Sequence, residues 1–122
     1  MPATKTNTGL KRLIKSWVPV LAWMAVIFYF SSLPGKEIPA LFPFQDVLFH
    51  LVIYAALGYL LKRALRDAWP KLTAARLILL VTIFCFIYGL SDEFHQSFVP
   101  GRDASILDLF IDTLGSFTGS LI

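Results

Sequence analysis

Residues 77–88 read LILLVTIFCFIY, an apolar run that shows no polar face at helical spacing. A surface helix of a soluble bundle needs such a face, because one side of the helix meets water. A helix that is apolar all round is instead buried in a large protein or surrounded by lipid. Residues 77–88 therefore favour a membrane protein over the alternative of a soluble four-helix bundle.

The composition of the chain supports the same class. Of its 122 residues, 57% are hydrophobic and only 16% are charged. A soluble domain of this length has too much surface to hide so much apolar material, and soluble domains are typically about 25% charged. The net charge of +3 is small, and no basic patch indicates a nucleic-acid partner. The length predicts one domain over residues 1–122.

Four apolar runs define the predicted architecture. We predict an all-α, polytopic membrane protein, a bundle of four transmembrane helices at about residues 17–33, 47–61, 77–92 and 104–121. Each run is shorter than the ~20 residues that cross about 30 Å of hydrocarbon, so each helix must include flanking residues. The cationic segment before residue 17 could also begin a secretory signal. No cleavage pattern follows it, so we expect an uncleaved first span.

Lysine and arginine gather in alternate connections. The N-terminal segment carries four and the connection between the second and third helices carries five, whereas the other two connections carry only Lys36 and Arg102. Cytoplasmic segments of membrane proteins are enriched in these residues. We therefore expect both termini in the cytoplasm and the loops of Lys36 and Arg102 on the outer side of the membrane.

Most of the acidic residues are predicted at the outer ends of the helices. The ionisable residues in this region are Asp46, His50, Asp92, Glu93, His95, Arg102, Asp103, Asp108 and Asp112. At a rise of ~1.5 Å per residue, His50 and Asp108 would lie at matching depths of about 6 Å and Asp112 at about 12 Å. Intramembrane ionisable residues are costly and usually functional. The alternative is that they form only a structural hydrogen-bond network.

Helical spacing places these polar groups on shared faces. One stripe contains Ser105, Asp108, Asp112, Gly115 and Gly119, and the other contains Asp46, His50, Tyr54 and Gly58. Small residues four apart let two helices approach closely. The glycines on the carboxylate stripe therefore predict that this face meets protein and not lipid. Arg102, His50 and Tyr54 are the nearest candidate partners for the carboxylates of this stripe.

The connection between the third and fourth helices contains further signals. Pro100 and Gly101 predict a turn. Arg102 follows them and can bind a carboxylate or a phosphate through two hydrogen bonds. Ser105 is a candidate N-cap for the fourth helix, although it could also serve the site.

These residues resemble the signature of the VanZ-like family. The matching positions are Asp92, Glu93, Gln96, Pro100, Gly101, Arg102, Ser105, Asp108, Gly115 and Gly119. Two positions depart from the family pattern, which often has Lys at the position of Val47 and Asn at that of Asp112. The resemblance implies a bacterial inner-membrane protein linked to the cell envelope and to tolerance of the glycopeptide teicoplanin. It implies no particular reaction.

Three functions are compatible with these observations. The first is acid–base catalysis on a lipid or lipid-linked envelope intermediate, with Glu93 or Asp92 as general base and His50 as proton shuttle. The predicted substrate-binding residues are Arg102, Gln96, Asp46, Ser105, Asp108 and Asp112. The second function is non-catalytic binding of a lipid headgroup or lipoglycopeptide, and the third is a structural or accessory role.

A metal site is a variant of the catalytic hypothesis. Its predicted ligands are Asp46, His50, Asp92 and Glu93. Carboxylate oxygens and imidazole nitrogens are common ligands of divalent cations. The sequence leaves the cofactor and the oligomeric state open.

Overall fold

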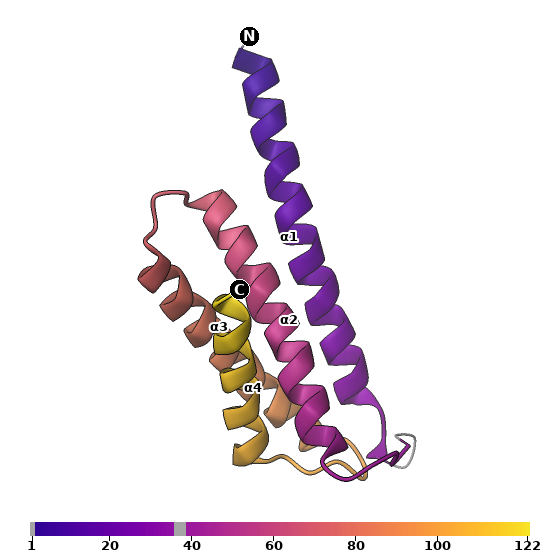
Figure 1. Cartoon of the computed structure of the whole chain (residues 1–122). Helices are drawn as coiled ribbons and strands as arrows, with labels where there is room; N and C mark the ends of the chain where they lie inside the picture. The colour runs from indigo at the N-terminus through magenta and orange to yellow at the C-terminus, as the bar shows by residue number, and fades with distance from the viewer. Residues whose placement is uncertain (1, 36–38) are drawn as a thin grey trace.

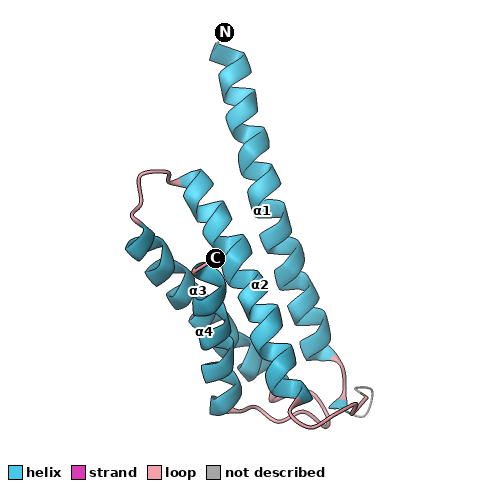
Figure 2. Ribbon diagram, viewed as in Figure 1, coloured by secondary structure: helices cyan, strands magenta, loops and turns pink. Residues whose placement is uncertain are grey.

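The computed structural model describes residues 2–35 and 39–122, and this part of the chain folds into helices without strands. The four helices are α1 (Pro2–Ser32), α2 (Gln45–Ala68), α3 (Ala74–Gln96) and α4 (Ile106–Ser120) (Figures 1 and 2). The all-α prediction is therefore confirmed. Lys36, which was counted among the cations of the predicted outer connections, lies outside the described residues.

Three of the helices are long and apolar enough to span a membrane, and the fourth is short. The candidate spans are Thr8–Ser32, Gln45–Ala68 and Ala74–Gln96. The helix α4 has 15 residues, which at ~1.5 Å per residue gives only about 22 Å. The structure therefore supports three spans, and the predicted bundle of four transmembrane helices is confirmed only in its helix count.

Two helices extend well beyond their apolar runs. The predicted helix at 47–61 continues to Ala68, and the one at 17–33 begins at Pro2. Lysine, arginine and leucine are good helix formers, so a helix does not stop where its apolar residues end. The end of α2 coincides with Trp69, whose helical conformation is disfavoured by the following Pro70.

The helix α2 occupies the centre and contacts each of the other three helices. Its buried residues Tyr54, Leu57 and Leu61 pack with Val20 of α1 and Val81 of α3. Side chains also bond across the helices, since the Trp23 indole donates to the Ile53 carbonyl at 2.8 Å. The core lies between α1, α2 and α3, and α4 closes the other side of α2.

Glycines bring α2 and α4 together. A Cβ atom added at Gly115 or Gly119 of α4 would overlap the backbone of α2, at Leu51 and Ala55 respectively. In the opposite sense, a Cβ atom at Gly58 of α2 would overlap the α4 backbone. The prediction that the glycine stripe meets protein is confirmed. The two helix axes are close enough to bring short polar side chains into direct contact.

The connections lie at opposite ends of the molecule. Residues 33–35, 39–45 and 97–105 lie together at one end, whereas the N-terminal part of α1 and the α2–α3 connection lie at the other (Figure 1). Gly101 makes the predicted turn with a positive φ of 74°. The Gly35 N–H donates to the Pro100 carbonyl at 3.0 Å, which ties the two connections to each other. This end is called the loop end below.

Candidate functional site

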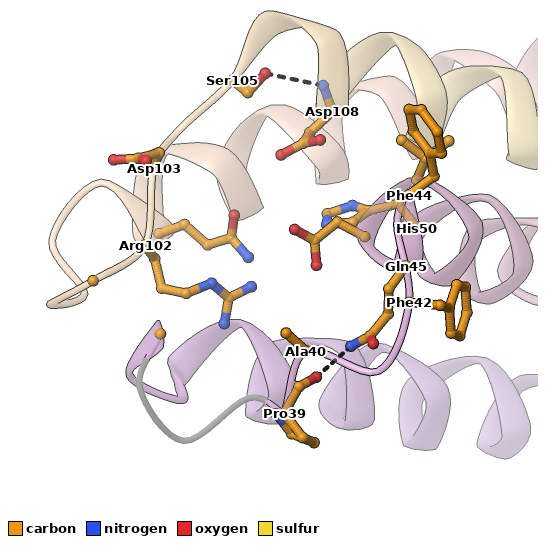
Figure 3. A pocket seen from close by; sticks show the side chains of 15 residues that line it. Pro39, Ala40, Phe42, Phe44, Gln45, His50, Arg102, Asp103, Ser105 and Asp108 are labelled. Carbon is orange, nitrogen blue, oxygen red and sulfur yellow. Dashed lines mark hydrogen bonds between the residues drawn. The ribbon is translucent and has the colours of Figure 1, made fainter.

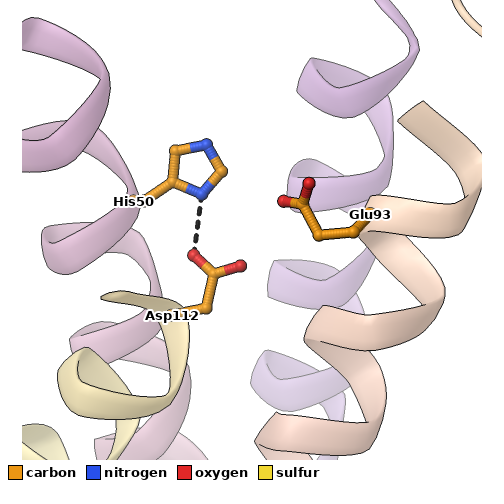
Figure 4. A group of neighbouring side chains, drawn as sticks. All are labelled: His50, Glu93 and Asp112. Atoms are coloured by element: carbon orange, nitrogen blue, oxygen red, sulfur yellow. Dashed lines mark hydrogen bonds and ion pairs between the residues drawn. The ribbon is translucent and has the colours of Figure 1, made fainter. Parts of the chain in front are cut away.

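A buried histidine–aspartate pair joins α2 and α4 below the loop end. The His50 Nδ1 atom lies 2.7 Å from Asp112 Oδ1, and both side chains are buried (Figure 4). From the first residues of their helices, Gln45 and Ile106, the rise of ~1.5 Å per residue places His50 about 7.5 Å and Asp112 about 9 Å along the axis. The residue that His50 contacts is thus Asp112, whereas Asp108, which was predicted at the depth of His50, lines a cavity together with His50.

Glu93 of α3 faces this pair from the opposite side of the bundle (Figure 4). Its Oε2 atom accepts a hydrogen bond from the Ser105 N–H at 2.9 Å. Ser105 is the N-cap of α4, where its Oγ atom accepts from the Asp108 N–H at 3.4 Å. The capping role predicted for Ser105 is thus confirmed, and the same residue anchors Glu93.

His50, Glu93 and Asp112 form one compact cluster. One ligand-type atom from each of them lies within 4.8 Å of the others. Two oxygens of the cluster, Glu93 Oε1 and Asp112 Oδ2, are buried without a hydrogen-bond partner. No described lysine or arginine forms an ion pair with either carboxylate. Buried polar groups nearly always have partners, so these two oxygens are unusual among the described residues.

Asp92 has a different environment from its neighbour Glu93. The side chain of Asp92 is buried, and the Tyr54 hydroxyl donates to its Oδ2 atom at 3.3 Å. Asp46 is exposed at the start of α2. The predicted metal set of Asp46, His50, Asp92 and Glu93 is therefore not gathered. In the structure Asp112 joins His50 and Glu93 instead. Asp92 does not, because successive residues on a helix, such as Asp92 and Glu93, point in different directions.

A polar cavity of about 540 Å³ opens at the loop end above the cluster (Figure 3). Six of the predicted site residues line it: Asp46, His50, Gln96, Arg102, Ser105 and Asp108. The remaining three, Asp92, Glu93 and Asp112, are not part of its lining. The cavity and the buried cluster are connected through His50, which belongs to both.

The loop of residues 39–45 forms one rim of the cavity. The Gln45 amide donates to the Pro39 carbonyl, and the Leu41 N–H donates to the Gln45 side chain, both at 2.7 Å. Phe42 and Phe44, which line the cavity on this rim, are 50% and 82% exposed. Exposed aromatic rings at a membrane boundary are typical of the headgroup layer.

Arg102 contacts backbone and not carboxylates. Its Nη1 atom donates to the Phe30 and Leu33 carbonyls, each at 3.0 Å, and so binds the end of α1. The predicted pairing of Arg102 with the α4 carboxylates does not occur. Its remaining donors face the cavity (Figure 3).

His95, the second histidine of the outer region, does not join the cluster. Its ring stacks on Phe28 with the centroids 4.5 Å apart and an interplanar angle of 15°. This contact holds α3 against α1. A histidine at a helix end can face either lipid or protein, so local sequence does not decide the contacts of His95.

An apolar groove of about 730 Å³ lies between α3 and α4. Its walls include Ile87, Leu90, Phe94 and Leu109, and Glu93 and Ser105 are also among its lining residues. Ser105 lines the polar cavity as well. Ser105 is therefore shared by the cavity and the groove, and the Glu93 carboxylate lies beside it.

Three apolar helices of spanning length identify an integral membrane protein, and α2, α3 and α4 contribute the residues of a buried ionisable cluster. The family model described as VanZ/LLP1 matches residues 16–122, so the chain belongs to this family. The predicted family resemblance is confirmed. Comparisons with curated proteins and with solved structures gave no match.

Proposed function

We propose that this protein binds a lipid or lipid-linked envelope molecule at the outer leaflet of the bacterial inner membrane and acts on its headgroup by acid–base chemistry. One observation carries the proposal: Ser105 is shared by a polar cavity and an apolar groove, and the Glu93 carboxylate lies beside it. An amphiphile has a polar head and an apolar tail. The cavity suits the head and the groove suits an acyl or prenyl chain.

The groups for acid–base chemistry are Glu93 and the His50–Asp112 pair. The Asp112 carboxylate accepts from His50 Nδ1, so it fixes the tautomer in which His50 Nε2 carries the lone pair. An imidazole oriented in this way by a buried carboxylate is a general base, as in catalytic triads. Arg102 lines the same cavity and its planar guanidinium suits a phosphate group.

Family membership supports the link to the cell envelope. The resemblance noted above connects VanZ-like proteins with teicoplanin tolerance, and a lipid-directed site fits a lipidated glycopeptide or its lipid-linked target. An alternative is binding without catalysis, in which the same cavity holds a headgroup or the antibiotic. The two functions differ in their need for a titratable group at Glu93.

We expect Glu93→Gln to reduce teicoplanin tolerance to the level of a strain that lacks the protein. Glutamine can still accept from the Ser105 N–H but cannot take up a proton, and removing a general base costs about 10²–10⁴-fold in rate. The measurement is teicoplanin susceptibility in a deletion strain that expresses each variant, with membrane levels compared by immunoblot.

The matched control is Asp67→Asn, which removes a carboxylate from the opposite end of α2, where Asp67 accepts from the Ser16 hydroxyl. It should retain tolerance. If Glu93→Gln also retains full tolerance, then catalysis by Glu93 is excluded and non-catalytic binding takes its place. If wild type itself fails to restore tolerance, the link to glycopeptides is wrong.

The proposed orientation places the loop end outside and both termini in the cytoplasm. Lys62, Arg63, Arg66 and Lys71 lie at the end of α2 and in the α2–α3 connection, away from the cavity (Figure 1). Segments rich in lysine and arginine remain on the cytoplasmic side.

Cysteine labelling tests this orientation. We expect a membrane-impermeant maleimide to label Asp103→Cys in intact spheroplasts and to label Lys71→Cys only after permeabilisation, since both positions are exposed. The native Cys85 is fully buried and should give a low background. Labelling of Lys71→Cys from outside would reverse the topology and move the cavity to the inner leaflet.

A further inference from the structure

We propose that His50, Glu93 and Asp112 bind one divalent transition-metal ion, with Zn²⁺ as the best fit. One candidate ligand atom from each of the three residues lies within 4.8 Å of the others. Ligand atoms around a tetrahedral zinc ion lie about 3.4 Å apart at bond lengths of about 2.0–2.2 Å. Small side-chain rotations therefore suffice to close the cluster around an ion.

The unpartnered oxygens are an independent observation that indicates a cation. Glu93 Oε1 and Asp112 Oδ2 accept no hydrogen bond from the described residues, although Glu93 is 6% exposed and Asp112 is 0% exposed. In Figure 4 both carboxyl groups face the space between α3 and the His50–Asp112 pair. A buried carboxylate without a partner is costly, and a metal ion is one of the few groups that stabilise it.

Charge strengthens this inference. Even a protonated His50 would leave the two carboxylates with one uncompensated negative charge, and no described lysine or arginine pairs with them. Asp92 lies one residue from Glu93, is also buried, and has Tyr54 as its bonded partner. A divalent cation would neutralise the cluster without any basic side chain.

The ligand types select the kind of metal. One imidazole and two carboxylates suit zinc, whereas magnesium prefers oxygen ligands and retains most of its waters. Three protein ligands with a fourth position open are typical of catalytic zinc sites. His50 lines the polar cavity, so the open position would face the proposed headgroup. A bound cation would occupy the lone pair of His50, so the water that it activates would replace His50 as the base in the same chemistry.

This inference extends the proposed function but is tested separately from it. The full-length protein is purified in detergent, stripped with EDTA, dialysed against ZnSO₄ and measured by elemental analysis. We expect one zinc per wild-type chain. We expect Asp112→Asn and Glu93→Gln to bind about 100-fold more weakly or worse, because loss of even outer-shell partners costs about 10–100-fold. The control Asp67→Asn should bind as wild type does.

A second measurement uses wild type alone, in case a variant does not fold. Titration with Co²⁺ should give the visible d–d absorption of a four-coordinate ion, and excess Zn²⁺ but not Mg²⁺ should remove it. Absence of that spectrum, or equal zinc binding by wild type and a folded Asp112→Asn, would overturn the proposal. A wild type that supports tolerance without binding zinc would reject the metal site and leave the lipid site intact.

Discussion

Gly119→Leu should separate α4 from α2 and destabilise the protein by about 3 kcal/mol or more, since overpacking a closed core costs about 1–3 kcal/mol even where only side chains must move. At Gly119 the added atoms would meet the α2 backbone at Ala55, which cannot rotate away. Because Asp112 is carried by α4, the same change should also separate it from His50. We expect a lower melting temperature in detergent, reduced accumulation in membranes and loss of function.

Gly9→Leu is the matched control for this substitution. Gly9 is also helical, but a Cβ atom there would meet nothing within 4 Å. Leucine has a higher helix propensity than glycine by about 1 kcal/mol, so Gly9→Leu should be neutral or slightly stabilising. Equal melting temperatures for the two variants would show that α2 and α4 are not in close contact.

His50→Leu should cost about 3–5 kcal/mol of stability, because removing one member of a buried pair leaves the Asp112 carboxylate uncompensated. Asp112 would lose its bonded partner while remaining 0% exposed. The double variant His50→Leu/Asp112→Leu removes both polar groups and should recover most of this loss. Reversible unfolding of the metal-stripped protein in mixed micelles would give the free energies of a double-mutant cycle.

The cycle distinguishes a coupled pair from two independent residues. A coupled pair requires the double variant to be more stable than the sum of the single effects predicts. If the two losses simply add, the His50–Asp112 contact contributes nothing measurable. A second double-mutant cycle, with Tyr54→Phe and Asp92→Asn, gives a coupling energy for comparison. The Tyr54–Asp92 hydrogen bond of 3.3 Å joins the same helix α2 to α3.

Arg102 shows why a side chain's function was predictable only in part. Its position after a Pro–Gly turn and at the loop end follows from the sequence. Its hydrogen bonds to the Phe30 and Leu33 carbonyls do not, because those residues are about 70 positions away in the chain. The last carbonyls of a helix lack internal partners, and a guanidinium that reaches them is held there.

The choice between Asp108 and Asp112 as the partner of His50 depended on a small difference in register. Depth along a helix is counted from its first residue, and a shift of two residues moves a side chain by ~3 Å. Ser105 sets that first residue by capping α4, and the Glu93 carboxylate holds the Ser105 N–H. Local sequence identified Ser105 as a cap, but only the contact with α3 shows what fixes its position.

The sequence by itself determined the membrane class, the helix count, the family and the two polar stripes, because each depends on local patterns of hydropathy, spacing or motif. The tertiary structure alone decided which polar groups meet: His50 with Asp112, Tyr54 with Asp92, and Glu93 with the N-cap of α4. It also showed that α4 is shorter than the three helices that are long enough to span a membrane. These contacts depend on the rotation and axial shift of one helix against another, which close glycine packing sets to within a few ångströms.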